Sequence, residues 1–156
     1  DERIPDSFEI ARKMSLSYSF GIANLTSAHP NSVVLEVKGK SGRTLEVQAC
    51  SLGGGRIMIN RLDGLDVNCS CEIPTLIVHN LDQPGHVAEV TSMLAHKSVN
   101  IANMSLYRDK RGGSAVMVVE MDQPLPKESL EWLEHLEGIV KVTYINVTEG
   151  EEDDVL

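Results

Sequence analysis

The alternation of two hydrophobic periods in residues 75–147 limits the possible folds of this chain more than any other feature. Short runs rich in β-branched and apolar residues are separated by turn signals and by two stretches with helical three-four spacing. The strand-like runs are 75–79, 100–108, 114–121 and 139–147, and the helical stretches are 84–97 and 127–136. Strand-helix-strand-strand-helix-strand is the order of a ferredoxin-like sandwich. We therefore predict a ferredoxin-like βαββαβ fold for this half, with Pro84 in the first helical turn.

The N-terminal half predicts one short helix followed by strands. Residues 4–14 fit a helix capped by Asp6 or Ser7. Runs 32–38 and 43–49 alternate apolar with polar residues around a Gly-Lys-Ser-Gly turn, which indicates a β-hairpin. Its apolar residues should face one another on one covered side; they are Val33, Leu35 and Val37 against Leu45, Val47 and Ala49.

These patterns predict an α+β protein with three parts. A mixed α/β domain rich in antiparallel strands should cover 1–68, and the βαββαβ domain should cover 74–147. Five of the acidic residues lie in the last eight positions, so residues 148–156 should form a solvated tail. The chain opens on Asp1 rather than Met, which we interpret as the sequence of an N-terminally incomplete protein.

Composition excludes several classes of function. The chain has 14 Lys and Arg against 23 Asp and Glu, a formal net charge of −9, which argues against a nucleic-acid partner. No run approaches the ~18 apolar residues of a membrane span. The 3 cysteines are an odd number, so a disulfide framework is not expected and a cytoplasmic location is the default.

The loop after the first strand of the second half is a candidate binding site. It contains Asn80, Asp82 and Gly85 just before a helix whose first N–H groups and dipole would attract a carboxylate. Gly85 would permit close backbone approach, and Asn80 and Asp82 could hold an amino group. The alternative is a plain strand-to-helix turn in which Asp82 caps the helix.

A second candidate site combines His29 and Asn31 with three consecutive glycines, Gly53, Gly54 and Gly55. Three glycines between strands suggest unusual dihedral angles or close approach, and such a loop can turn several N–H groups towards an anion. His29 and Asn31 would supply further polar contacts. The alternative is a bulge beside a surface histidine.

Established catalytic patterns are missing from the sequence. It has no glycine-rich nucleotide loop, zinc-protease motif or nucleophile elbow. His79, His86, His96 and His135 lack zinc-ligand spacing with cysteine, so we expect surface or helix-flank positions for them. Cys50, Cys69 and Cys71 are interpreted as buried or incidental thiols. We therefore predict no catalytic residue and no metal site on this chain.

Residues 80–85 and 99–101, Asn-Leu-Asp-Gln-Pro-Gly and Val-Asn-Ile, resemble the ACT domain. In the serine-binding ACT domain of phosphoglycerate dehydrogenase, a His, an Asn and a second Asn across a dimer seam hold the ligand. The matching positions here are Asn80, Asp82 and Asn100, so the resemblance implies a possible ligand site at Asn80, Asp82, Gly85 and Asn100. Two of the three types differ, which favours an assembly role for this module, including homo-association through its sheet.

Three further motifs, at 4–11, 29–31 and 51–57, lie ahead of that domain and resemble the beta chain of iron–sulfur L-serine dehydratase. The resemblance implies an allosteric-substrate-binding domain in which His29, Asn31 and the Gly53–Gly55 backbone bind L-serine as effector. It also implies an alpha-chain partner that carries a [4Fe–4S] cluster, no cofactor on this chain, and a holoenzyme that deaminates L-serine to pyruvate and ammonia.

Two other interpretations remain open at the level of sequence. One is the amino-acid-binding regulatory module of a phosphoglycerate-dehydrogenase-like protein, which would lie beside a Rossmann catalytic domain. The other is a structural scaffold without a ligand, for which substitutions at Gly53–Gly55 would change stability alone.

Overall fold

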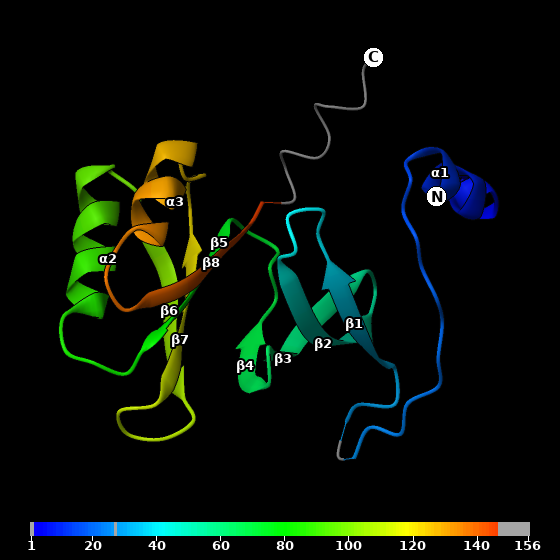
Figure 1. The fold of residues 1–156 in the computed structure, drawn as a ribbon, viewed down its shortest axis with the longest axis horizontal. Coiled ribbons are helices and arrows are strands. Elements are labelled where there is room, and N and C mark those ends of the chain that lie inside the picture. Colours follow the sequence, from blue (N-terminus) through cyan, green and yellow to red (C-terminus); the bar gives the residue numbers. More distant parts are fainter. Residues whose placement is uncertain (1, 27, 147–156) are drawn as a thin grey trace.

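The computed structural model describes residues 2–26 and 28–146, which form two four-stranded antiparallel sheets and few helices (Figure 1). The prediction of an α+β protein is confirmed. The predicted acidic tail, 148–156, lies outside the described residues.

The C-terminal sheet has the predicted βαββαβ order. Its elements are β5 (Thr75–Leu81), α2 (His86–His96), β6 (Ile101–Arg108), β7 (Ser114–Met121), α3 (Lys127–Glu134) and β8 (Ile139–Ile145). The strand order is β6-β7-β5-β8, and both helices cover one face. The core beneath them includes Leu76, Val90, Leu94 and Leu133, all 0% exposed.

The start of α2 differs from the prediction. The helix begins at His86, so Pro84 precedes it instead of occupying its first turn. The N-cap is Gly85, with φ 110°, and no side chain caps the helix. Asp82 is therefore not the cap. A backbone angle of this kind suits glycine, because a Cβ makes positive φ unfavourable for other residues.

The N-terminal sheet has the strand order β1-β2-β3-β4. Its strands are β1 (Ser32–Lys38), β2 (Thr44–Gly53), β3 (Arg56–Leu62) and β4 (Leu65–Cys69). The predicted register is confirmed, with Leu35 opposite Val47. Strand β4 was not predicted, although Asp63-Gly64 is a hairpin signal and both residues have positive φ, 45° and 83°.

A second core joins the two sheets. The face of the C-terminal sheet that the helices leave free packs against the N-terminal sheet, which Figure 1 shows on the side opposite α2 and α3. This inter-sheet core consists of Ala49, Ile59, Leu62, Val67, Cys69, Cys71, Ile77, Val116 and Val118. Because side chains alternate along a strand, Leu76 and Val78 point to the helices while Ile77 points to the other sheet.

The apolar side of the first hairpin is only half covered. Leu45 and Val47 pack against the inter-sheet core, but Val33, Leu35 and Val37 are 48%, 49% and 51% exposed. The prediction of one covered side is therefore wrong for β1. Strand β1 is the outermost strand of its sheet, and among the described residues no second layer covers this part of its surface.

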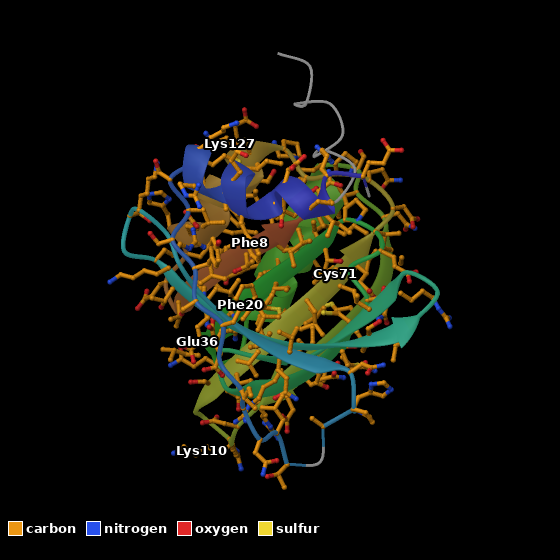
Figure 2. All side chains as sticks on the ribbon, turned by 90° about the vertical axis from the view of Figure 1, so that its right-hand side faces the viewer. Phe8, Phe20, Glu36, Cys71, Lys110 and Lys127 are labelled. Carbon is orange, nitrogen blue, oxygen red and sulfur yellow. The ribbon has the colours of Figure 1, made fainter. Side chains whose placement is uncertain are left out.

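The residues before β1 form an N-terminal arm, defined here as residues 4–22. The predicted helix is present as a 3-10 turn, Ile4–Asp6, followed by α1, Ser7–Lys13, and no side chain caps either segment. Figure 1 shows α1 away from both sheets. Phe8, labelled with Phe20 in Figure 2, stacks on Tyr18 at 5.3 Å between ring centroids, and Phe20 packs edge-on against Tyr18. These rings are 50–83% exposed.

Candidate effector sites

The His29-Pro30-Asn31 segment leads directly into β1 and is fixed by local hydrogen bonds. The backbone N–H of Asn31 donates to His29 Nδ1 at 3.2 Å, and the Ser32 hydroxyl donates to the His29 carbonyl oxygen at 2.6 Å. The Ser51 N–H donates to the Asn31 carbonyl at 2.9 Å. The His29 and Asn31 side chains are exposed, so both are available for contact with a small molecule.

The triple glycine forms the tight turn between β2 and β3, where Gly53 pairs with Arg56. Gly53, Gly54 and Gly55 have φ of 84°, 63° and 78°, and a Cβ at any of them would meet open space. Two consecutive positive φ values are the requirement of a type I′ hairpin turn. The conformation, rather than close packing, therefore explains the glycines at this turn.

The structure places the His29–Asn31 segment and the triple glycine at the same end of the N-terminal sheet. The carbonyl of Asn31 is hydrogen-bonded to Ser51, two residues before Gly53 along β2. The two halves of this candidate site come from separate segments that the register of β1 with β2 brings together. Exposed polar side chains beside a positive-φ turn suit a small polar ligand that carries a carboxylate.

The loop after β5 is held by the hairpin between β6 and β7. Asp82 Oδ2 accepts hydrogen bonds from Gly112 N at 2.9 Å and Arg108 Nη1 at 3.1 Å, and the Asp82 N–H donates to Gly113 O at 2.8 Å. The Gly112 hydrogen bond, opposed by slight burial and reinforced by Arg108, lowers the pKa of Asp82. This carboxylate therefore has a structural role in tying two loops together.

Asn80 and Asn100 do not converge within one chain. Asn80 is 6% exposed, and its Nδ2 donates to the Leu81 carbonyl at 2.6 Å. Asn100 precedes β6 and donates from Nδ2 to Asp122 Oδ2 at 2.6 Å. Because β6 and β5 both run antiparallel to β7, they are parallel to each other, and Asn100 lies at the opposite end of the sheet from Asn80. The possible ligand site at Asn80, Asp82, Gly85 and Asn100 is therefore not assembled within one chain.

A polar cluster in the seam between the sheets was not predicted from the sequence. Lys141 Nζ donates to the Asp63 carboxylate and to Thr44 O, while His79 Nε2 lies 3.6 Å from Asp63 Oδ2. Burial alone would raise the pKa of Asp63, but the Glu46 N–H and Lys141 outweigh it and lower the pKa. Burial lowers the pKa of His79, partly offset by Asp63.

The expectation of a surface or helix-flank position is wrong for His79, which lies on a central strand, and His86, although it begins α2, is buried. His79 is 8% exposed and His86 is 7% exposed. His79 occupies the inward face of a central strand, and His86 lies beside Gly138 and binds Glu89 Oε2 through Nδ1 at 3.2 Å. The alternation of β5 already places His79 on the same face as Ile77, which was the available signal.

The three thiols are buried, as predicted. Cys69 and Cys71 have their Sγ atoms 3.7 Å apart, and Cys50 lies on β2. An iron–sulfur cluster is held by several thiolates around its irons. Within residues 2–26 and 28–146, no group of three or more His, Cys, Asp or Glu side chains is placed to hold a metal ion, so this part of the chain does not fit such a cluster.

No helix among the described residues is long and apolar enough to cross a membrane.

Comparisons with known proteins match the architecture described above. The family model of the ACT domain matches residues 74–137. A probable L-serine dehydratase beta chain from Bacillus subtilis is 32% identical over 145 residues, covering 93% of this chain and 66% of the relative. The chain belongs to the L-serine dehydratase beta-chain family. A second beta chain, from Peptoniphilus asaccharolyticus, is 29% identical over 148 residues, covering 94% of this chain and 67% of the relative.

Nearly the whole of this chain therefore aligns with beta chains. The chain spans about two thirds of the length of these two relatives. D-3-phosphoglycerate dehydrogenase from Methanocaldococcus jannaschii is 31% identical over 90 residues, 58% of this chain and 17% of that protein. The dehydrogenase of Bacillus subtilis aligns over 139 residues, 88% of this chain, but at 24% identity and over only 26% of its own length. The beta chains are therefore matched over a much larger share of their own length than the dehydrogenases are.

Proposed function

We propose that this chain is the regulatory and assembly beta subunit of an L-serine dehydratase, an L-serine ammonia-lyase that deaminates L-serine to pyruvate and ammonia. The observation that carries the proposal is the similarity to beta chains over 93% and 94% of the chain. In this proposal the chain is not catalytic alone, and the [4Fe–4S] cluster belongs to the alpha chain. The cluster would supply Lewis-acid chemistry to the holoenzyme.

The proposed effector is L-serine, bound at His29, Asn31 and the Gly53–Gly55 turn within an allosteric-substrate-binding domain, residues 1–68. The serine carboxylate would be received by N–H groups of the positive-φ turn, and the exposed His29 and Asn31 side chains would bind its polar groups. An effector changes activity only through unequal affinity for two states, and a difference of ~1–3 kcal/mol is typical.

The proposed partner is the alpha chain of the dehydratase. Support comes from the uncovered apolar side chains of β1 and of the N-terminal arm, since exposed apolar patches of this kind commonly mark protein interfaces. We place the assembly in the cytoplasm, where reducing conditions keep thiols free, in agreement with the free Cys50, Cys69 and Cys71.

The ACT domain, proposed as 74–147, would support assembly. Strand β6 is an edge strand of the C-terminal sheet and can pair with another β6. Antiparallel pairing of two copies would bring Asn100 of one copy near the 80–85 loop of the other. This association would assemble the possible ligand site at Asn80, Asp82, Gly85 and Asn100, which one chain leaves divided.

The second candidate function is a regulatory module of a phosphoglycerate-dehydrogenase-like protein, favoured by the 31% identity to the Methanocaldococcus jannaschii enzyme. Purification of the native complex separates the two. The dehydratase proposal expects a cysteine-rich partner chain, bound iron, and serine-dependent pyruvate formation that this chain alone lacks. A Rossmann-type partner domain with nicotinamide-dependent activity, and no iron, would replace the proposal with the alternative.

A further inference from the structure

Helices α2 and α3 lie on the side of the molecule away from the N-terminal sheet (Figure 1). A groove runs between these two helices. Its volume is about 650 Å³, within the range of small-ligand pockets. The groove is lined by Ala88, Glu89, Ser92, Met93, His96 and Lys97 of α2, and by Glu128, Ser129 and Trp132 of α3. None of these residues belongs to the proposed serine site.

The walls of the groove offer an apolar surface and one unsatisfied hydroxyl. Trp132, the only tryptophan of the chain, is 45% exposed, and Met93 of α2, 8% exposed, lines the same groove. Ser129 is 2% exposed, and its Oγ has no hydrogen-bond partner among the described residues. A buried hydroxyl without a hydrogen-bond partner is unfavourable, and this one belongs to a residue that lines the groove.

One end of the groove carries two opposite charges without ion-pair partners. The two helices are antiparallel, since His86 at the start of α2 lies beside Gly138 after the end of α3. Lys97 therefore lies at the same end as Glu128, in the first turn of α3. Neither side chain forms an ion pair within the described part of the chain, whereas Glu89 and His96 are hydrogen-bonded to His86 and the Ser92 carbonyl.

The N-terminus of α3 adds positive potential to the end of the groove that carries Lys97. No side chain caps the helix, and the Ser129 N–H already donates to the Pro126 carbonyl at 3.0 Å. The N–H groups of Lys127 and Glu128, together with the positive end of the helix dipole, can attract a carboxylate. A simple anion would be repelled by Glu128 and a simple cation by Lys97. A zwitterion satisfies both, and the apolar walls require a large apolar substituent next to it.

We propose that the α2–α3 groove binds an amino acid with a large apolar side chain. Its carboxylate lies between Lys97 and the first turn of α3, and its ammonium group faces Glu128. The side chain lies along the groove between Met93 and Trp132, where it excludes water from the indole ring. This site differs in place and in ligand from the serine site, so either can fail without the other.

Titration of the full chain with L-phenylalanine, followed by Trp132 fluorescence and by calorimetry, tests the proposal. The expected result is a saturable change in tryptophan emission with matching heat. Phenethylamine lacks the carboxylate and 3-phenylpropionate lacks the ammonium group. Each should bind at least about tenfold more weakly, because either Lys97 or Glu128 then has no partner of opposite charge. L-serine should leave Trp132 emission unchanged, since it cannot fill the apolar walls.

Matched charge reversals complete the test. Lys97→Glu should weaken L-phenylalanine binding at least about tenfold, whereas Lys110→Glu, the same change on the distant β6–β7 hairpin, should leave it unchanged. Circular dichroism and urea titration check that both variants fold. Absence of both the emission change and the heat at millimolar L-phenylalanine, or equal affinity of Lys97→Glu and wild type, would overturn the proposal.

Discussion

The two sheets of this protein differ in how completely they are covered. The C-terminal sheet lies between the helices and the N-terminal sheet, and residues of its central strands such as Leu76, Ile77 and Val116 are 0% exposed. The N-terminal sheet uses part of one face for the inter-sheet core, while Val33, Leu35 and Val37 on β1 stay about half exposed. One sheet is the centre of the molecule and the other supplies its second layer.

The difference is already visible in the pattern of apolar residues. Strands buried on both faces tend to be continuously apolar, as in Leu76-Ile77-Val78 and Val116 to Val119. Strand β1 alternates, which shows that its apolar side chains share a face but not whether anything covers that face. The continuous runs of β5 and β7 thus indicated a second layer on the C-terminal sheet.

The largest expected effect contrasts the two sheets directly. Ile77→Ala removes a fully buried side chain of the inter-sheet core and should reduce the free energy of unfolding by about 2–5 kcal/mol. Leu35→Ala, on the half-exposed strand β1, should reduce it by only about 0.5 kcal/mol. Urea denaturation measures both. Equal losses would show that the covering differs less than the structure indicates.

The next effect concerns the glycine turn. Gly54→Ala should destabilise by about 1–2 kcal/mol, because φ of 63° brings Cβ too close to the backbone although the surrounding space is open. Gly54→Asn should lose less stability, since asparagine tolerates positive φ better than alanine does. Gly39→Ala, in the other hairpin and without positive φ, is the matched control and should be nearly neutral. Similar losses for all three variants would remove the conformational explanation.

The seam between the sheets should respond to pH. Burial lowers the pKa of His79 from 6.5, so the unfolded chain binds more protons there and stability falls as pH drops below about 6.5. Asp63 also makes the protein less stable at low pH. Its pKa in the folded protein is below 3.8, so its stabilising contribution is lost as pH falls through that lower value. The urea midpoint of His79→Gln should depend less on pH than that of wild type below 6.5. If the urea midpoints of His79→Gln and wild type changed with pH in the same way, His79 would not be the origin of the pH dependence.

The smallest effect is expected at Asp82. Asp82→Asn weakens the bonds to Gly112 N and Arg108, so amide exchange in the 109–113 hairpin should accelerate while global stability changes little. L-serine binding should stay unchanged, because Asp82 serves the C-terminal sheet. A loss of serine binding in this variant would indicate that L-serine binds at the 80–85 loop instead.

The sequence predicted elements far better than it predicted contacts between them. Local periodicity placed the four strands and two helices of the ACT domain, and the hairpin alternation gave the register of β1 with β2. Strand β4 was missed although Asp63-Gly64 marks its turn. The proximity of Asp63 to Lys141 and the groove between α2 and α3 depend on tertiary packing, for which residues distant in sequence give no local signal.

The candidate sites show the same limit. The three consecutive glycines indicated either unusual dihedral angles or close approach, and only the structure shows positive φ at Gly53–Gly55. The pairing of β1 with β2 places the His29–Asn31 segment at the same end of the sheet. The role of Asp82 did not follow, because its partners, Arg108 and Gly112, lie on a hairpin that reaches it only in the folded sheet.

The most direct test of the proposed sensing role is calorimetry of the purified chain with L-serine. We expect saturable heat with the wild-type protein and affinity weakened at least about tenfold in His29→Ala. Affinity should be unchanged in His135→Ala, which alters an exposed histidine after α3. Absence of heat at high serine, or identical affinity of His29→Ala and wild type, would contradict the assignment of L-serine sensing to the N-terminal sheet.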